Sequence, residues 1–342
     1  MGFRVKVRQL PEPFTVEAGQ TVLDAAFAAG YDYPCGCQSG NCGACKSIVI
    51  SGEVEMAPYS EYALTDEEKA AGQVLACRAM PWSDVEMAWL EADDVAQHAQ
   101  RQLECRVVGL ASLTHDIRQL RLEILSGGPF TFSAGQYARV RFAGLPARDF
   151  SMANQPDDPV LEFHIRAVDG GAVSSFVQNH LKLGDPVRVE GPRGIAFLRE
   201  KHTGPLLALA GGSGLAPILC IVERALTLGF RQPIRLYFGV RDERDLYFEN
   251  RFAELAQRNA NFRFAPVLSQ PAATTDRRTG FLADVLAADL AGENLDGTKA
   301  YLAGPPVMVE TCIAALRRLG LGAEACHADA FYTEADRARM AS

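Results

Sequence analysis

Three cysteines in one short segment constrain this chain more than any other feature of its sequence. Cys37, Cys42 and Cys45 have the spacing C-x4-C-x2-C, and a fourth cysteine, Cys77, follows after a longer gap. This arrangement is typical of a plant-type [2Fe–2S] cluster. A tight loop can wrap three thiolates around two irons while a distant turn brings the fourth. Three glycines among the cysteines let the backbone come close to the sulfides, where a Cβ would collide.

A structural zinc site and a disulfide are the alternatives for these cysteines. Zinc sites favour two C-x2-C pairs, and this sequence has only one. Nine cysteines in a reducing compartment indicate a metal site with buried thiols and not a set of disulfides. We therefore predict that Cys37, Cys42, Cys45 and Cys77 are the metal ligands. The thiols predicted to be simply buried are Cys105, Cys220, Cys312 and Cys326.

The composition predicts a soluble protein of two or three domains. The chain has 342 residues, of which 48% are hydrophobic and 22% charged. No apolar run reaches the ~18 residues that a membrane span needs. The N-terminus lacks the hydrophobic region of a signal peptide. We expect a cytoplasmic protein without a membrane partner.

The net charge of −8 is unevenly distributed. Residues 1–95 carry 6 basic and 15 acidic side chains, a net charge of −9, whereas residues 96–342 carry 28 and 27, a net charge of +1. This balance argues against a nucleic-acid partner. The acidic first domain is either a docking face for a basic protein or a solvated acidic surface, and the charge alone does not decide between them.

The predicted first domain, residues 1–93, has the order β-β-α-loop-β-α-β. Phe3, Val5 and Val7 alternate with polar residues, as in a half-buried strand. Thr65 and Glu68 form a capping box that opens the second helix. The other expected elements are strands at 14–16, 47–50 and 85–87 and a helix at 22–29. This is a small β-grasp pattern with the cysteine loop at one end.

A polar, alanine-rich segment at 94–101 is predicted to be a linker, and residues 102–200 then read as an antiparallel β-barrel. Gly-Pro and Gly-Gly pairs separate its strands, expected at 104–110, 117–124, 137–142, 161–168 and 187–190, with one helix at 174–181.

Strands and helices alternate over residues 204–332, which predicts a parallel α/β sheet. The strands are expected at 206–210, 234–238, 262–267 and 300–302, and the helices at 216–228, 249–258, 281–290 and 306–319. Residues 333–342 are expected to form a flexible tail.

The first of these strands runs into the turn Gly-Gly-Ser-Gly-Leu-Ala-Pro at 211–217 and then into a helix. A buried strand that delivers a glycine turn to a helix N-terminus is typical of a pyrophosphate site, because free amides and the helix dipole face the anion. The third glycine of the Rossmann pattern is absent, and Pro217 stands there.

Taken with this turn, several motifs give the chain a family resemblance. They are Gly-Gln-Tyr at 135–137, Arg-Asp-Phe-Ser-Met-Ala-Asn at 148–154, Phe-His-Ile-Arg at 163–166, Gly-Gly at 170–171, Gly-Pro-Arg-Gly at 191–194 and Ala-Gly-Pro-Pro at 303–306. The chain resembles the ferredoxin–NADP+ reductase superfamily. The order of its domains resembles the reductase components of multicomponent aromatic-ring-hydroxylating oxygenases, of the naphthalene dioxygenase reductase type.

The resemblance implies FAD in the barrel domain. Arg148 is then expected to pair with the flavin phosphate, and Phe150 to lie against the isoalloxazine. Ser151 is expected to act catalytically, by hydrogen bonding near flavin N5, the atom that accepts hydride. The residues expected to surround the rest of the FAD are His164, Ile165, Arg166, Gly171, Val173 and Ser174.

The resemblance also implies a nicotinamide dinucleotide in the last domain. Gly212, Ser213 and Gly214 are expected to bind it, and Gly304 and Pro305 to bound the nicotinamide pocket. The family resemblance makes NADH the expected donor, with NADPH as the alternative. Carboxylates that suit a ribose diol and an arginine, Arg241, that suits a 2′-phosphate both follow one strand, so these residues alone do not decide. Phe331 is expected either to cover the flavin ring or to pack in the core.

Two positions depart from the family. Phe150 replaces the usual tyrosine, which removes a hydroxyl and implies weaker binding of FAD. Ala303 replaces the usual cysteine near the reacting nicotinamide carbon, which implies slower or differently gated hydride transfer.

The function implied is electron transfer from NADH through FAD and the [2Fe–2S] cluster to a Rieske-type ferredoxin or to the terminal oxygenase, in aromatic hydrocarbon catabolism. A reductase of a di-iron hydroxylase or of a bacterial cytochrome P450 has the same domain order and is the alternative. A redox-sensing binding module is a third hypothesis, which no basic patch or DNA-binding helix pair supports.

Overall fold

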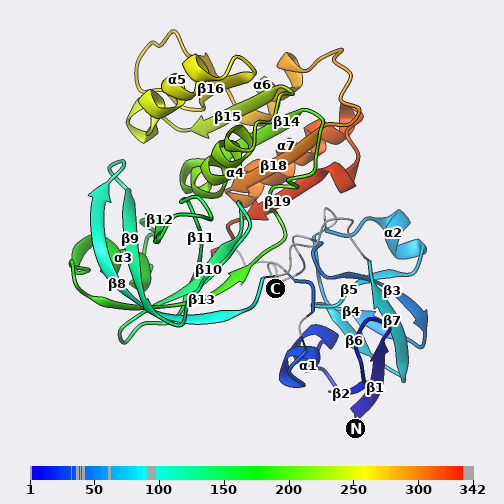
Figure 1. Cartoon of the computed structure of the whole chain (residues 1–342). Coiled ribbons are helices and arrows are strands. Elements are labelled where there is room, and N and C mark those ends of the chain that lie inside the picture. The colour runs from blue at the N-terminus through cyan, green and yellow to red at the C-terminus, as the bar shows by residue number, and fades with distance from the viewer. Residues whose placement is uncertain are drawn as a thin grey trace. The chain divides into compact units, whose positions relative to one another are not determined.

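The structure is a computed structural model that describes residues 2–31, 33–35, 38, 40, 43–60, 63–90 and 98–333. The chain divides into two compact units (Figure 1). The first comprises residues 1–95 and 332–342, and the second residues 96–331.

The first unit contains a five-stranded sheet in the order β2-β1-β7-β3-β5. β1 and β7 pair in parallel, and the other neighbours are antiparallel. In β1, Val5 and Val7 are buried while Arg4 and Lys6 are exposed, as the alternating pattern predicted. The strands are β1 (Gly2–Val7), β2 (Phe14–Glu17), β3 (Lys46–Ser51), β5 (Gln73–Leu75) and β7 (Val85–Trp89), and a two-stranded ribbon joins β4 (Val54–Met56) to β6 (Ala79–Pro81).

Two short helices cover this unit, α1 (Val22–Ala28) and α2 (Asp66–Ala70). The Thr21 side chain accepts a hydrogen bond from the Asp24 amide, and Thr65 and Glu68 form the predicted capping box. The sequence did not predict β4, β5 and β6, because three-residue strands are too short for an alternating pattern to show.

The second unit begins with a six-stranded antiparallel sheet in the order β11-β10-β13-β8-β9-β12. A bridge between Met152 and Phe163 joins the two ends of this order, so the sheet is nearly closed into a barrel. The elements are β8 (Arg101–Ser112), β9 (Ile117–Ser126), β10 (Tyr137–Phe142), β11 (Arg148–Ser151), β12 (Val160–Arg166), α3 (Ala172–Asn179) and β13 (Pro186–Arg193). β8 starts inside the segment expected to be a linker, and of that segment residues 94–97 lie outside the described residues.

A parallel sheet in the order β17-β16-β15-β14-β18-β19 completes the second unit. Its strands are β14 (Leu206–Gly211), β15 (Ile234–Val240), β16 (Phe262–Leu268), β17 (Arg278–Thr279), β18 (Lys299–Gly304) and β19 (Cys326–Ala330). Its helices are α4 (Leu215–Thr227), α5 (Glu249–Arg258), α6 (Leu282–Asp289) and α7 (Pro306–Arg318), with 3-10 turns η1 (Gly212–Gly214), η2 (Glu243–Asp245) and η3 (Ala323–Ala325).

The two faces of this sheet are both buried, which explains its continuous apolar strands. In β14, Leu206, Ala208 and Ala210 belong to a core shared with α4, α5 and the barrel. Leu207 and Leu209 point the other way, into a core shared with α6 and α7. Figure 1 shows α4 and α7 with the sheet strands β14 and β18. Because one core is continuous between the barrel and the parallel sheet, the two lobes hold each other in place.

The predicted fold class is confirmed: a β-grasp domain, an antiparallel barrel and a parallel-sheet domain. β19 was not expected as a strand, because its sequence, Cys-His-Ala-Asp-Ala, has low β propensity. It forms by backbone pairing with β18, where Ala303 lies opposite Asp329. The predicted tail, apart from Thr333, lies outside the described residues.

Candidate functional site

The cysteine loop brings two of the four predicted ligands together. Cys45 and Cys77 are both buried, with 3% and 4% of their surfaces exposed. The Cys77 amide donates a hydrogen bond to Cys45 Sγ over 3.4 Å, and the Ala76 amide donates to the Cys45 carbonyl. Cys37 and Cys42 lie outside the described residues.

Two glycines show how closely this loop is packed. Gly40 has a φ of +79°, and a Cβ there would lie 2.9 Å from side-chain atoms of Tyr59 and Arg78. Gly43 has a φ of +74°, and its Cβ would lie 3.0 Å from the Ala63 carbonyl oxygen. The loop therefore requires glycine at both positions. Adjacent buried thiols, one of which accepts an amide hydrogen bond, fit an iron–sulfur cluster.

The other cysteines predicted as buried thiols have the environment of inert groups. Burial raises the pKa of the Cys105 and Cys312 thiols to about 12 and that of the Cys326 thiol to about 11. Burial also raises the pKa of Cys220, whose Sγ donates to the Asn154 carbonyl oxygen. These thiols stay protonated at neutral pH and are not available as thiolate ligands.

The barrel strand β11 places Ser151 against the parallel-sheet lobe. Ser151 is 6% exposed, and its Oγ donates a hydrogen bond to Asp329 Oδ2 at 3.0 Å. Because Asp329 lies opposite Ala303 in the β19–β18 register, three residues distant in sequence meet at one point. The sequence prediction missed Asp329, since nothing in the local pattern distinguishes this carboxylate from other acidic residues.

The other two predicted flavin residues of β11 lie beside Ser151. Phe150 is partly buried and packs against the shared core. Arg148 is partly buried, and its Nη1 donates to the Ala147 carbonyl oxygen at 2.9 Å. Both residues pair with β10, Phe150 opposite Ala138 and Arg148 opposite Val140, so the barrel sheet fixes their spacing.

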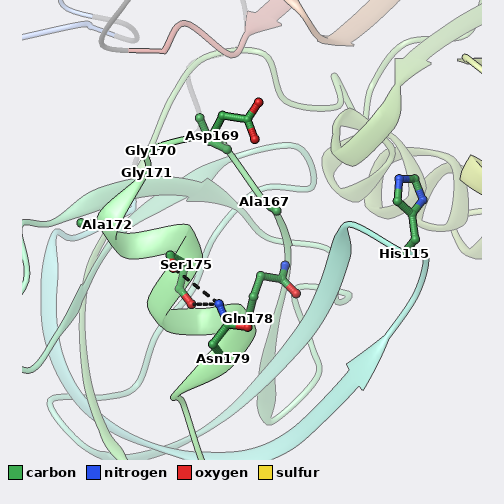
Figure 2. Close-up of a pocket in the computed structure, with 10 residues that line it drawn as sticks. His115, Ala167, Asp169, Gly170, Gly171, Ala172, Ser175, Gln178 and Asn179 are labelled. Carbon is green, nitrogen blue, oxygen red and sulfur yellow. Dashed lines mark hydrogen bonds between the residues drawn. The ribbon is translucent and has the colours of Figure 1, made fainter.

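A cavity of about 600 Å³ opens at the N-terminus of α3. Gly171 precedes the helix, and a Cβ there would lie 2.7 Å from Ser174 Oγ. Ser174 Oγ is already occupied, because it accepts from the Val168 amide at 3.0 Å. Val173 is 4% exposed and packs in the core. Figure 2 shows the first turn of α3 on one side of this cavity and His115 on another.

The side chains of Val173 and Ser174 already have partners within the protein. The groups that this end of the helix can offer a ligand are therefore its backbone amides. Free amides and the positive end of the helix dipole suit a phosphate group.

His164 and Ile165, predicted as cofactor contacts, have interior side chains. His164 Nδ1 lies 3.2 Å from the Tyr247 hydroxyl, and its Nε2 lies 3.1 Å from Glu162 Oε1. Burial lowers the pKa of His164, although the Glu162 carboxylate opposes this shift. Ile165 is fully buried. Neither residue lines the cavity at α3. The Tyr247 hydroxyl in turn donates to the Gly212 carbonyl oxygen at 3.3 Å.

The glycine turn η1 follows β14 and lies against the carboxyl end of β18. A Cβ on Gly214 would be 2.1 Å from the Ala303 carbonyl oxygen. Gly304 has a φ of +143°, and its Cβ would lie 2.9 Å from the Gly211 carbonyl oxygen. Phe331, whose amide donates to the Gly304 carbonyl oxygen at 2.9 Å, packs against the shared core. The close approach of the backbones therefore explains the glycines at the carboxyl ends of β14 and β18.

A second cavity, of about 190 Å³, lies against this turn. Arg166, Gly212, Arg241 and Pro305 contribute to its wall, whereas Ser213 and Gly214 do not. Arg166 Nη1 is 2.8 Å from where a Cβ on Gly212 would lie, so the guanidinium covers the turn. Arg166 was predicted as an FAD contact, and the structure places it on the glycine-turn side.

Among the described residues, no helix is both long and apolar enough to cross a membrane.

Comparison with protein families assigns three consecutive regions. Residues 5–81 match the 2Fe-2S iron-sulfur cluster binding domain, residues 104–197 the oxidoreductase FAD-binding domain, and residues 208–313 the oxidoreductase NAD-binding domain.

Similar proteins cover nearly the whole chain. The ferredoxin–NAD(P)+ reductase component of the naphthalene 1,2-dioxygenase and salicylate 5-hydroxylase systems of Ralstonia sp. is 42% identical over 319 residues, 92% of this chain and 94% of the relative. The reductase component of phenol 2-monooxygenase from Pseudomonas sp. strain CF600 is 36% identical over 348 residues, 100% of this chain and 98% of the relative.

A solved structure agrees with these sequence relatives. The crystal structure of an Amycolatopsis cytochrome P450 reductase has a TM-score of 0.76 and 36% identity, covering 96% of this chain and 98% of that one.

Proposed function

Because the chain belongs to the family of ferredoxin–NAD(P)+ reductase components of oxygenase systems, we propose that it passes electrons from NADH to a Rieske-type ferredoxin or to the terminal oxygenase of an aromatic-ring-hydroxylating system. The protein is an NAD(P)H-dependent oxidoreductase with domains for a [2Fe–2S] cluster, FAD and NAD, which confirms the predicted family, enzyme class and cofactors. We also propose that the protein prefers NADH to NADPH and that it is cytoplasmic.

The observation that supports this function best is the hydrogen bond from Ser151 Oγ to Asp329 Oδ2. This bond joins the barrel, which matches FAD-binding domains, to β19. β19 pairs with β18 at Ala303 and is the edge strand of the lobe that matches NAD-binding domains. A flavin and a nicotinamide that react must meet where the two lobes meet. We assign this point as the reaction site, with Ser151 the catalytic residue and Asp329 holding its hydroxyl in one orientation.

The remaining site residues are proposed from their positions. Arg148 offers its guanidinium to the flavin phosphate, and Phe150 offers a ring to the isoalloxazine. The amides after Gly171 bind the diphosphate of FAD. His164, Ile165, Val173 and Ser174 support these groups from the interior. When bound, FAD accepts a hydride and supplies electrons singly, while the cluster carries one electron at a time.

For the nicotinamide dinucleotide, the amides of Gly212, Ser213 and Gly214 and the Arg166 guanidinium bind the diphosphate. Gly304 and Pro305 bound the nicotinamide, and Arg241 lies at the cavity wall for the adenosine half. The Phe331 ring covers the flavin ring. Cys45 and Cys77, with Cys37 and Cys42, hold the [2Fe–2S] cluster as thiolates.

A monooxygenase system is the alternative source of the electron acceptor. The similarity to reductases of phenol 2-monooxygenase and of a cytochrome P450 supports a monooxygenase as the alternative partner, because the domain order is shared and only the acceptor differs.

One visible absorption spectrum tests the core of this proposal. The purified protein should show flavin and [2Fe–2S] bands, and anaerobic NADH should bleach both, with NADPH slower at equal concentration. A protein that binds FAD but is not reduced by either nucleotide would contradict the proposed function.

A further inference from the structure

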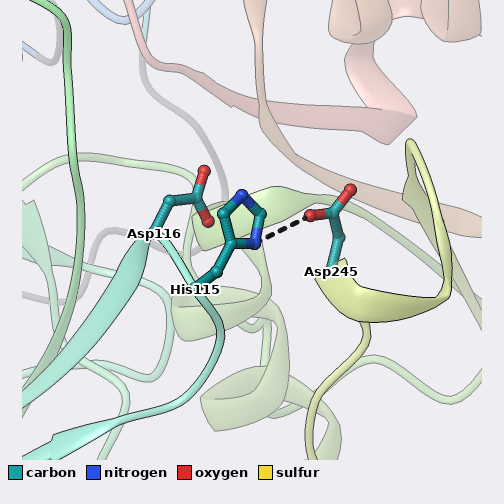
Figure 3. A group of neighbouring side chains, drawn as sticks. All are labelled: His115, Asp116 and Asp245. Atoms are coloured by element: carbon teal, nitrogen blue, oxygen red, sulfur yellow. Dashed lines mark ion pairs between the residues drawn. The ribbon is translucent and has the colours of Figure 1, made fainter.

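His115 connects the two lobes of the second unit by a contact with a carboxylate. It lies in the turn between β8 and β9, and its Nδ1 is 3.4 Å from Asp245 Oδ1 in η2 (Figure 3). The His115 side chain is 44% exposed and that of Asp245 is 10% exposed. The histidine therefore exchanges protons readily with solvent, while the carboxylate that it meets is mostly withdrawn from water.

Both carboxylates near His115 are held in place by other groups. Asp245 Oδ2 accepts a hydrogen bond from the Asp242 amide at 3.1 Å. Asp116 Oδ2 accepts from Arg166 Nε at 2.7 Å, and its Oδ1 accepts from the Thr114 hydroxyl at 2.9 Å. Burial alone would raise the pKa of Asp116, but these hydrogen bonds and the nearby positive charges lower it.

One atom from each of His115, Asp116 and Asp245 lies within 4.8 Å of the others. Arg166 pairs with Asp116 at 2.7 Å and His115 pairs with Asp245 at 3.4 Å, while His115 also adds to the positive charge around Asp116.

The two carboxylates of this cluster lie in the wall of the cavity at the glycine turn, whereas His115 lines the larger cavity at α3. Arg166 also lines the cavity at the glycine turn, close to Gly212. A nicotinamide dinucleotide brings a doubly negative diphosphate to such a turn. Two carboxylates in the wall oppose that charge. Arg166 forms an ion pair with Asp116, and among the described residues the ion-pair partner of Asp245 is His115, which offsets the carboxylate while its ring carries a proton.

We propose that His115 is a positioning residue for the nicotinamide dinucleotide: its protonated ring neutralises Asp245 and joins the barrel to the nicotinamide lobe, so that binding of the dinucleotide takes up a proton. This inference rests on the proposed function, because it needs the dinucleotide to bind at the glycine turn.

The direction of the pH dependence follows from the charges. A histidine changes its charge between about pH 5 and 8. The other charged groups facing His115 are Asp116 on its own turn, Arg166 on β12, Asp169 across the larger cavity and Asp245 on η2, and carboxylates and guanidinium groups keep their charge over this range. While the His115 ring carries a proton, its ion pair with Asp245 is present and binding is tighter. When the ring loses the proton, the ion pair is lost and binding weakens.

By linkage, the bound dinucleotide favours the protonated ring to the same extent that the protonated ring favours the dinucleotide. A partly exposed ion pair changes affinity modestly, so the expected change in Kd across the range is about three-fold.

The test is calorimetric titration of NAD+ into the oxidised, FAD-loaded full-length protein near pH 7, in two buffers with different ionisation enthalpies. The wild-type protein should take up a fraction of a proton, and its Kd should rise about three-fold between pH 5.5 and 8.5. His115→Gln should take up none and stay at the weaker affinity, whereas His115→Lys should stay at the tighter one. The kcat with saturating NADH should be the same in all three proteins.

Two further variants make the result specific. Asp245→Asn keeps an oxygen for the Asp242 amide but loses the charge, so binding should become independent of pH at the tighter level. His180→Gln changes an exposed histidine at the end of α3 that lines neither cavity, and it should retain the wild-type proton uptake.

The outcomes separate this inference from the function on which it depends. If wild-type protein binds NAD+ without proton uptake, or if His115→Gln still takes up the proton, the role of His115 is wrong and the reductase function stands. If the FAD-loaded wild-type protein does not bind NAD+, the proposed function fails and this inference fails with it.

Discussion

In the first unit, the backbone amide of Cys77 reaches the sulfur of Cys45, 32 residues away, within one small domain with its own core. In the second unit, Ser151 reaches Asp329 across 178 residues and between two lobes that share a core. The described part of the proposed cluster site thus lies inside a single domain, whereas the proposed flavin–nicotinamide site depends on how two lobes pack. From this difference we predict that loss of the cluster leaves hydride transfer undisturbed, whereas substitutions on either lobe alter the hydride site.

The largest effect is expected for Cys77→Ser. Loss of one thiolate should remove or destabilise the [2Fe–2S] cluster, so electron delivery to the protein acceptor falls to background while FAD stays bound. Iron and sulfide analysis alongside the flavin spectrum measures this directly. Cys312→Ser, at a buried thiol of α7, is the matched control and should keep full iron. Wild-type iron and sulfide in Cys77→Ser would remove this residue from the ligand set.

The next largest effect is expected for Gly304→Ala. The backbone there has a φ of +143°, and the new Cβ would meet the backbone of Gly211 at 2.9 Å. The second unit should lose about 2–4 kcal/mol of stability, and NADH binding should weaken, while the cluster content is unchanged. Thermal unfolding with iron analysis tests both parts. Gly229→Ala, which also has positive φ but open space around it, should cost only about 1 kcal/mol.

Ser151→Ala removes the hydroxyl that meets Asp329 without changing the packing of β11. Flavin reduction by NADH should slow about ten- to hundred-fold, because a positioned hydroxyl oxygen near the reacting atoms is lost. Stopped-flow absorbance under anaerobic conditions gives the rate, and the cluster spectrum should stay that of the wild type. Asp329→Asn should slow the same step less, since an amide still accepts from Ser151. An unaltered rate in Ser151→Ala would place the reaction elsewhere.

The smallest effect is expected for Ala303→Cys. Ala303 is 1% exposed, lies opposite Asp329 in β19 and contacts the turn at Gly214 through its carbonyl. A thiol there should change the rate of flavin reduction a few-fold while the affinity for NADH stays nearly constant, because the added atom meets the nicotinamide and not the diphosphate. Ala300→Cys, at the opposite end of the same strand, should leave the rate unaltered. If Ala303→Cys behaves the same way, position 303 is not part of the reaction site.

The sequence predicts features that depend on local patterns, but not features that depend on how the two lobes pack. The cysteine spacing and the strand–glycine–helix pattern are local, so the cluster, the barrel and the parallel sheet could all be predicted. Asp329 could not, because β19 is held by pairing with β18 and its composition does not favour a strand. Arg166 was expected to contact FAD because of the family resemblance, and this contact stays a prediction. The place of Arg166 over Gly212 depends on Asp116 and on the packing of the lobes, which no local pattern encodes.

Residues 1–95 carry a net charge of −9, which fits either a docking face for a basic protein or a solvated acidic surface. The two alternatives predict different salt dependences. Electron delivery that weakens as ionic strength rises from a low value would favour docking, since screening shortens the reach of that charge.

The most direct test compares the full-length protein with a fragment of residues 96–342, using ferricyanide and the protein acceptor on both. The second unit has its own core, so the fragment should fold, bind FAD and reduce ferricyanide with NADH at nearly the full-length rate. It should lose most electron delivery to the protein acceptor, because the cluster that serves as the exit is missing. A fragment that reduces the protein acceptor as fast as the full-length protein would show that electrons leave from the flavin, contradicting the proposed path.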